Sequence, residues 1–171
     1  MSDSRDGDAG VPAEADGRVA AALAAWFEQR GVAHRRVEHA PTQTSEESAR
    51  VRREPLEIGG KALLLKIDDA FALFVLSAAR RLDNAAIRNA LGVRKARFAT
   101  REELWAATGL VPGSVPPFGE PLLPFALHAD PSILDQPRIA FNAGLLTRSC
   151  VLATADWIDL ARPTRLAFST A

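Results

Sequence analysis

Residues 59–66 read Gly-Gly-Lys-Ala-Leu-Leu-Leu-Lys, and the predicted fold is organised around this stretch. Apart from Lys66, every residue from 62 to 67 is apolar, and Asp68-Asp69 then offers a turn, which is typical of a core strand. The two glycines let the backbone turn sharply or approach a ligand closely. Lys61 therefore stands where a buried strand leaves solvent, and it either simply ends the strand or directs its ammonium into a cleft.

A phosphate-binding loop is excluded for the same stretch. Pro55 occupies the position of the first glycine of such a loop. Ala62 lacks the hydroxyl group that would hold magnesium. Lys61 is therefore not interpreted as the lysine of a nucleotide-binding loop.

Length and composition indicate one globular domain. The chain has 171 residues and a mass of 18.4 kDa, with 47% hydrophobic and 25% charged residues. Lysine plus arginine equals aspartate plus glutamate at 21 each, so a polyanionic partner would have to be met by local positive charge. Residues 1–16 are acidic and rich in glycine and alanine, and we expect a disordered tail there, followed by a single domain at residues 17–171.

Cysteine usage and hydropathy favour a cytoplasmic location. Cys150 is the only cysteine, which excludes an internal disulfide and a multi-cysteine zinc site and fits a reducing compartment. No apolar segment approaches the roughly 20 residues that span a bilayer. The N-terminus lacks the basic and apolar regions of a secretory signal.

Turn and capping signals divide the chain into short elements. Thr44 with Glu47, and Thr100 with Glu103, have the spacing of a capping box, which predicts a helix start at both places. The expected helices span residues 16–31, 44–53, 83–92, 100–109 and 154–161, and the expected strands span 32–38, 62–67, 71–77, 96–99, 122–129, 138–142 and 148–153.

The loop at residues 110–121 and the order of the expected helices and strands predict the fold class. Residues 110–121 contain four prolines and two glycines, so we expect an ordered loop or a lid. The two strands around residues 68–70 are expected to form a hairpin in the middle of a sheet. The whole is an α/β or α+β single domain, with a curved, barrel-like mixed sheet of about six or seven strands flanked by helices.

Four places carry more chemical capability than packing requires: Lys61, the loop at residues 113–117, the pair His128 and Asp130, and Asn142. The prolines of the loop either rigidify a connection or hold the backbone N–H groups of Gly113 and Ser114 in the array of an oxyanion site. A His-x-Asp pair is more often solvated or structural than a proton relay. The histidines and the cysteine show no spacing typical of metal ligands.

Covalent catalysis has little support in the sequence. There is no Gly-x-Ser-x-Gly motif, and Cys150 lies in an apolar strand, where a thiol is usually inert. What remains is a cation, fixed backbone donors and an amide. Such a set can position an ester and a water without covalent attack.

Several motifs follow one another in a recognisable order. They are His39-x-Pro-Thr42, Gly60-Lys61, Thr108-Gly109 at a helix end, the Gly-x-x-x-Pro loop from Gly113 to Pro117, Asp130, and Phe141-Asn142-Ala143-Gly144. This pattern covers residues 34–163 and resembles the YbaK/prolyl-tRNA-synthetase-associated editing domain family. Residues 139–149 and Thr154-Ala155-Asp156 are similar to the freestanding YeaK-like branch, whose members act in trans on mischarged tRNA.

The resemblance implies a curved mixed sheet and an activity. Members hydrolyse the ester that joins a wrong, small amino acid to the terminal adenosine of tRNA. Lys61 matches the family's essential lysine, and Gly113 with Pro117 matches its Gly-x-x-x-Pro loop. Asn142 stands where some members carry histidine or serine, which leaves the amino-acid preference open. Serine is favoured, then threonine or alanine, and no metal or other cofactor is implied.

The resemblance and the chemistry together predict residue roles. Lys61 is expected to neutralise the terminal phosphate or the carbonyl end of the ester, while Gly113 and Ser114 donate backbone hydrogen bonds, and these three are the expected catalytic residues. A small pocket would admit the wrong residue and exclude the larger cognate one. The residues expected to contact the substrate are His39, Thr42, Pro117, Asp130, Asn142 and Gly144.

Local positive charge and two alternatives complete the prediction. The basic clusters at residues 50–53 and 94–101 either are solvated faces or contact tRNA phosphates, and Arg50, Arg53 and Arg97 are the expected contacts.

The expected partners are the acceptor end of mischarged tRNA and an aminoacyl-tRNA synthetase. The alternatives are a catalytically silent module of the same fold that binds tRNA or a synthetase, and a hydrolase of another activated acyl ester.

Overall fold

The computed structural model describes residues 10–171, and the part of the expected tail at residues 1–9 lies outside the described residues. A five-stranded mixed sheet of order β5-β2-β3-β6-β9 forms the middle of the molecule. Its strands are β2 (Gly60–Ile67), β3 (Ala70–Ser77), β5 (Ala96–Phe98), β6 (Ala126–Ala129) and β9 (Thr164–Arg165). The predicted hairpin is confirmed, because β2 and β3 pair antiparallel over their full length.

The remaining strands form two separate sheets. One has the order β1-β8-β7, and the other pairs β10 with β4. These strands are β1 (Arg35–Glu38), β4 (Arg81–Leu82), β7 (Arg138–Leu145), β8 (Arg148–Ala153) and β10 (Ser169–Thr170). The mixed α/β single domain is confirmed, but the expected single curved sheet is replaced by three sheets, and no closed barrel forms among residues 10–171. The physical reason is that, among the described residues, the backbone of β7 pairs with the segment leading into β2 only through an isolated bridge between Gly59 and Ala140.

The helices begin and end at the residues that the capping signals predict, to within a residue or two. They are α1 (Arg18–Arg30), α2 (Ser45–Arg52), the short 3-10 helix η1 (Leu56–Ile58), α3 (Asn84–Leu91), α4 (Arg101–Thr108), α5 (Pro131–Leu134) and α6 (Thr154–Ala161). Thr100 and Glu103 form the complete predicted capping box. At α2 only half of the box forms, because the Glu47 carboxylate accepts from the Gln43 N–H. No helix within the described residues has the length and apolar character needed to cross a membrane.

Apolar side chains cover both faces of the five-stranded sheet. On one face, Leu64 and Val75 pack in the main core, which also takes in side chains of α1, α6, β7 and the loop after α4. On the other face, Phe74 and Leu76 pack with Ile87 of α3. A sheet buried on both faces explains the nearly continuous apolar runs of β2 and β3.

Residues just before α1 pack against the body of the protein. Ala15 is buried, and the Glu14 carboxylate accepts a hydrogen bond of 3.0 Å from the Leu146 N–H. The Asp16 N–H donates to the Gly109 carbonyl at 3.0 Å. These contacts differ from the expectation of a disordered tail up to residue 16, because the last part of that segment has burial and hydrogen-bond partners.

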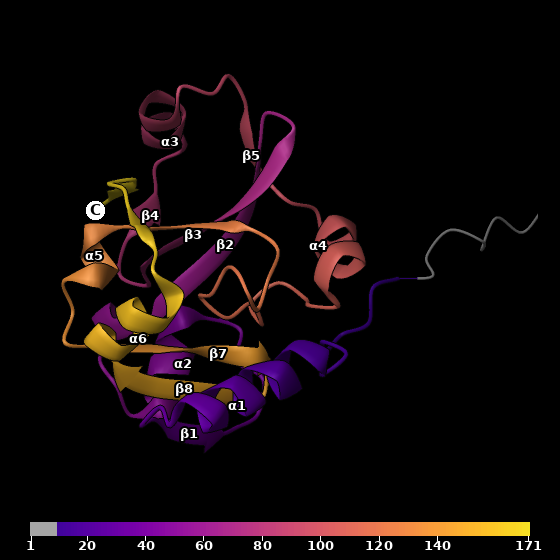
Figure 1. Cartoon of the computed structure of the whole chain (residues 1–171), viewed down its shortest axis with the longest axis vertical. Helices are drawn as coiled ribbons and strands as arrows, with labels where there is room; N and C mark the ends of the chain where they lie inside the picture. Colours follow the sequence, from indigo (N-terminus) through magenta and orange to yellow (C-terminus); the bar gives the residue numbers. More distant parts are fainter. Residues whose placement is uncertain (1–9) are drawn as a thin grey trace, which may run out of the picture.

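The first half of β2 has an unpaired edge. On that side β5 pairs only with residues 65–67 of β2. Figure 1 shows α1 lying across the three-stranded sheet at the lower end of the molecule, with β2 running upward from this region toward β5 and α3. The edge at the start of β2 therefore borders the space between α2, the loop after α4 and β7.

Candidate active site

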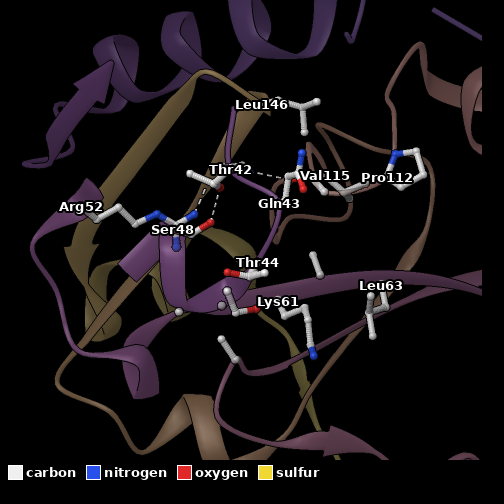
Figure 2. A pocket seen from close by; sticks show the side chains of 17 residues that line it. Thr42, Gln43, Thr44, Ser48, Arg52, Lys61, Leu63, Pro112, Val115 and Leu146 are labelled. Carbon is white, nitrogen blue, oxygen red and sulfur yellow. Dashed lines mark hydrogen bonds between the residues drawn. The ribbon is translucent and has the colours of Figure 1, made fainter. Parts of the chain in front are cut away.

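A cavity of about 400 Å³ lies beside the unpaired edge of β2 (Figure 2). Five segments of the chain form it: residues 42–52, the start of β2, the residue that follows β3, the loop after α4, and β7 with its following turn. The lining residues are Thr42, Gln43, Thr44, Ser45, Ser48, Arg52, Gly59, Gly60, Lys61, Ala62, Leu63, Ala78, Pro112, Gly113, Val115, Asn142 and Leu146. The structure thus brings together four residues from the predicted site: Thr42, Lys61, Gly113 and Asn142.

Lys61 is the second residue of β2 and lines the cavity. Side chains alternate between the faces of a strand, and Leu63, on the same face as Lys61, packs on the α3 side of the sheet. Ala62 and Leu64 face the main core. Figure 2 shows the Lys61 side chain extending from β2 on the side away from Arg52. Lys61 is half-buried, so its ammonium can meet a ligand at the edge of the cavity while remaining hydrated.

Gly113 presents its backbone on the opposite side of the cavity. It is exposed and has φ of +88°, in the region that favours glycine. Its carbonyl accepts a hydrogen bond of 2.8 Å from Asn142 Nδ2, which fastens the loop to β7. Within the described residues the Gly113 N–H makes no hydrogen bond, so it can donate to a bound molecule.

Arg52, the last residue of α2, organises the polar wall of the cavity. Its Nε donates to Ser149 Oγ at 2.9 Å, and its Nη2 donates to Asn142 Oδ1 at 3.0 Å. Ser149 Oγ also lies 2.7 Å from His39 Nε2. His39 does not line the cavity, and it reaches the site only through Ser149. The network ties α2 to β7 and β8.

The cavity is electropositive. Burial lowers the pKa of Arg52 to about 10, so its guanidinium still carries a full charge at neutral pH. None of the ion pairs among residues 10–171 includes Arg52 or Lys61. The residues that line the cavity include no Asp or Glu. The described residues that line this space therefore include two cations and no carboxylate.

Ser114 and Pro117 lie behind the cavity wall. Ser114 is fully buried, and both its N–H and its hydroxyl donate to the Val111 carbonyl, at 3.0 and 2.7 Å. The expectation that Ser114 donates a backbone hydrogen bond to the substrate is therefore wrong, because the loop uses that donor itself. Pro117 is also buried, and its carbonyl accepts a hydrogen bond of 2.8 Å from Trp157 Nε1. Pro117 holds the loop against α6 and does not contact the cavity.

Asp130 belongs to another part of the molecule. It is 2% exposed and precedes α5, where its carboxylate accepts from the Ser132 N–H at 2.8 Å. It also accepts from the Phe168 and Ser169 N–H groups and from the Ser169 hydroxyl, at 2.7, 2.9 and 2.8 Å. The expectation that Asp130 borders the amino-acid pocket is therefore wrong, because these bonds direct it to the C-terminal segment.

Gly144 is a packing residue in the irregular end of β7. It has φ of +86°, and its N–H donates to the Ser114 carbonyl at 3.0 Å. A Cβ at this position would lie 2.7 Å from the Ala20 backbone nitrogen of α1. Gly144 does not line the cavity, and the expectation that it contacts the substrate is wrong because α1 packs directly on it.

Gly144→Ala is expected to lower the free energy of unfolding by about 2–4 kcal/mol, since the alanine would combine backbone strain with a clash against α1. The matched control is Gly92→Ala, where φ is +65° but nothing lies within 4 Å of the added Cβ. We expect the control to cost only about 1 kcal/mol. Urea unfolding of both variants measures the difference, and equal losses would show that contact with α1 is unimportant.

The three arginines expected to contact tRNA have different surroundings. Arg97 is exposed on β5 and forms a two-pronged ion pair with Glu103, at 2.7 and 3.1 Å. Arg50 and Arg53 are exposed at the end of α2, the helix that also lines the cavity. Contact of these arginines with tRNA stays a prediction, and the α2 pair is better placed for it than Arg97.

The thiol of Cys150 is not available as a nucleophile. Cys150 is buried in β8, and burial raises the pKa of its thiol to about 11, which keeps it protonated at neutral pH. Within the described part of the chain, no three His, Cys, Asp or Glu side chains are grouped as metal ligands.

Comparison with known proteins identifies the family. Residues 39–160 match the model of the aminoacyl-tRNA editing domain. The chain belongs to this family. The chain is 34% identical over 147 residues to the "Multifunctional Ser/Thr-tRNA deacylase ProXp-y" of Escherichia coli (strain K12), a match that covers 82% of this chain and 87% of that relative. It is also 37% identical over 83 residues to a proline--tRNA ligase of Shouchella clausii, covering 48% of this chain and 14% of the ligase.

A solved structure supports the shared fold of the editing domain. A crystal structure described as a putative trans-editing enzyme for prolyl tRNA synthetase superposes with a TM-score of 0.78. The sequence identity is 24%, and the match covers 90% of this chain and 98% of that one. At this identity the likeness concerns the fold alone.

Sequence reasoning missed part of the site of the editing domain. It placed Arg52 only within the basic cluster at residues 50–53, which was expected either to be solvated or to contact tRNA phosphates, and it did not single out Ser149 or Ser48. One signal was available, because Ser48 and Arg52 are four positions apart and therefore share a helix face. Figure 2 shows both side chains on the cavity side of α2.

Proposed function

We propose that this protein is a trans-acting aminoacyl-tRNA deacylase. It hydrolyses the ester of mischarged tRNA that carries a small amino acid, with serine preferred over threonine and alanine. The observation that supports the proposal is the cavity itself, whose lining includes Lys61, Gly113 and Asn142, in a member of the editing domain family. The 34% identity to a relative named as a Ser/Thr-tRNA deacylase supports the substrate class.

The proposed chemistry needs charge stabilisation and no protein nucleophile. The aminoacyl ester is already activated, so a water can attack its carbonyl carbon when the ester is held in place. Lys61 and the Gly113 N–H stabilise the negative charge that develops on the carbonyl oxygen. The bond from the carbonyl carbon to the ribose oxygen then breaks, and the proton lost by the water passes to that oxygen, with the neighbouring ribose hydroxyl as the relay.

Asn142 and Arg52 support this arrangement from behind. Asn142 Nδ2 holds the Gly113 carbonyl, and Asn142 Oδ1 is itself held by Arg52 and by the Ser149 hydroxyl. Both polar ends of the amide are thus engaged within the protein. Asn142 therefore acts as a positioning residue that fixes the Gly113 backbone relative to β7.

The size of the cavity supports selection of small residues. Its volume of about 400 Å³ is at the lower end for small-molecule sites, and it must hold part of the terminal nucleotide as well as the amino acid. A larger cognate residue is excluded by size, while a smaller error enters and is cleaved. The substrate is the acceptor end of tRNA, and a prolyl-tRNA synthetase is the proposed partner that produces the errors.

A panel of tRNAs charged with serine, threonine, alanine and proline tests the proposal. We expect the seryl ester to be hydrolysed at least ~100-fold faster than the spontaneous rate, which corresponds to only about 3 kcal/mol of barrier lowering, and the prolyl ester to be spared. Absence of hydrolysis with any member of the panel would favour a silent binding module. Equal cleavage of a free seryl ester and of the tRNA-linked ester would favour a general esterase.

A further inference from the structure

Arg52 is a buried cation that has no counter-ion among the described residues. Its side chain is 7% exposed, yet its two side-chain hydrogen-bond partners, Ser149 and Asn142, are neutral. Burial of a charge without a counter-ion is costly. A nearby carboxylate, Glu54, is already paired with Arg35 and Arg138 and does not reach the Arg52 guanidinium. Within residues 10–171, the positive charge at this position is therefore not compensated by an ion pair.

The guanidinium of Arg52 also keeps unused donors that face the cavity. A guanidinium has five N–H groups, and the bonds to Ser149 and Asn142 use two of them. Nη1 makes no hydrogen bond to the described residues. It is also not fully buried, so a ligand can reach it. A Cβ atom added to Gly59, which lines the cavity, would lie 3.9 Å from Nη1. Nη1 is therefore open to a ligand in the cavity.

The chemistry of an aminoacyl-tRNA end leaves one group that suits this position. The α-amino group of the amino acid is cationic and is repelled by Arg52. The ester carbonyl offers one neutral oxygen. The phosphodiester that joins the last two nucleotides carries a full negative charge and two free oxygens, which match the planar fork of a guanidinium.

We propose that Arg52 binds this terminal phosphodiester in the substrate complex. The proposal rests on the proposed function and assigns the two cations of the cavity to different groups. Arg52 holds the phosphate on the α2 side, and Lys61, whose side chain leaves β2 on the other side, is left for the ester (Figure 2). Arg52 thereby sets the direction in which the terminal nucleotide enters the cavity.

The test measures binding of stable substrate analogues in which an amide replaces the ester. One analogue is 3′-seryl-amido adenosine, which has no phosphate. The second carries the same group on a cytidine–adenosine dinucleotide with its phosphodiester, and the third has a neutral methylphosphonate in place of that phosphodiester. We expect the unmodified protein to bind the phosphodiester analogue about 10- to 100-fold more tightly than the methylphosphonate.

Substitution of Arg52 provides the second arm of the test. Arg52→Gln is expected to bind the phosphodiester and methylphosphonate analogues equally and to keep most of its affinity for the nucleoside analogue. Arg30→Gln, the same charge change at an exposed position at the end of α1, should behave as the unmodified protein. If Arg52→Gln does not fold, the methylphosphonate comparison in the unmodified chain still shows whether a cation senses the phosphate, and the same comparison in Lys61→Ala shows whether that cation is Lys61.

Two outcomes would overturn the assignment. Equal affinity of the unmodified protein for the phosphodiester and the methylphosphonate would show that no cation senses the phosphate. An equal loss of affinity for all three analogues in Arg52→Gln would show that Arg52 only positions Asn142 and Ser149. Deacylation of Ser-tRNA by the unmodified protein is measured separately, so failure of the proposed function is distinguished from failure of this assignment.

Discussion

Lys61→Ala is expected to lower the rate of the chemical step in Ser-tRNA hydrolysis by about 100- to 1,000-fold, the usual effect of removing one preorganised group that stabilises an oxyanion. Lys61 lines the cavity and belongs to no ion pair among the described residues, so its ammonium is available to the ester. The fold should be unaffected, because the side chain is half-buried and lies at the start of β2. Single-turnover deacylation at saturating enzyme gives the chemical rate directly.

Lys66→Ala is the matched control for this experiment. Lys66 lies further along the same strand, opposite Phe71, and its Nζ is 5.8 Å from the centre of that ring. It does not line the cavity. We expect the Lys66 variant to retain the chemical rate of the unmodified protein. A Lys61→Ala protein that hydrolyses Ser-tRNA as fast as the Lys66 variant would exclude the proposed role of Lys61.

Asp130→Asn is expected to lower the free energy of unfolding at neutral pH by about 2–4 kcal/mol, since hydrogen bonds to a buried charged group are lost and an amide is left facing backbone donors. The carboxylate joins the start of α5 to the N–H groups of Phe168 and Ser169. The substitution keeps the shape of the side chain, so the loss reports the charge and its partners. Urea unfolding of the variant and the unmodified protein measures it.

The effect of Asp130→Asn should depend on pH in a defined direction. Burial raises the pKa of Asp130, but hydrogen bonds from Ser132, Phe168 and Ser169 outweigh it and hold the pKa below its ordinary value. A depressed carboxyl pKa stabilises the fold above the unfolded pKa of about 3.9, and this contribution is lost as the pH falls through the folded pKa. The two proteins should therefore differ most at neutral pH and converge in acid.

Asp135→Asn is the control for the stability experiment. Asp135 is an exposed carboxylate whose side chain is 63% accessible and which pairs with Arg165 at the surface. An exposed pair of this kind contributes little, so we expect a loss below about 1 kcal/mol. If Asp130→Asn were no more destabilising than Asp135→Asn while KM for Ser-tRNA rose, Asp130 would belong to the substrate site after all.

Much of the local structure follows from neighbours in the sequence. The Thr100 and Glu103 box forms as predicted, because its two hydrogen bonds join residues within one helical turn. The hairpin of β2 and β3 follows from two apolar runs separated by a short turn. Such signals need no knowledge of the rest of the molecule, so sequence patterns suffice for them.

The division of the strands into sheets did not follow from the pattern. The short strands β4, β9 and β10 have two residues each, too few for an alternation to stand out from a loop. Whether β7 and β8 continue the sheet of β2 or pair with β1 depends on long-range contacts. The register of Arg35 opposite Val151 is one such contact, and no local signal specifies it.

The sequence by itself determined that Lys61 begins a core strand, that Gly113 lies in a proline-rich loop and that a family pattern connects them with Asn142. Only the tertiary structure decided which polar groups face the common cavity. Ser114 has a backbone donor and Asp130 has a carboxylate, as the predicted site required, but both groups form hydrogen bonds with other parts of the protein. In the sequence Arg52 resembles an ordinary surface arginine, but packing against β7 and β8 buries it, and no described residue forms an ion pair with it. The reason is that a capping box or a turn depends on adjacent residues, whereas burial and charge compensation depend on segments that meet only after folding.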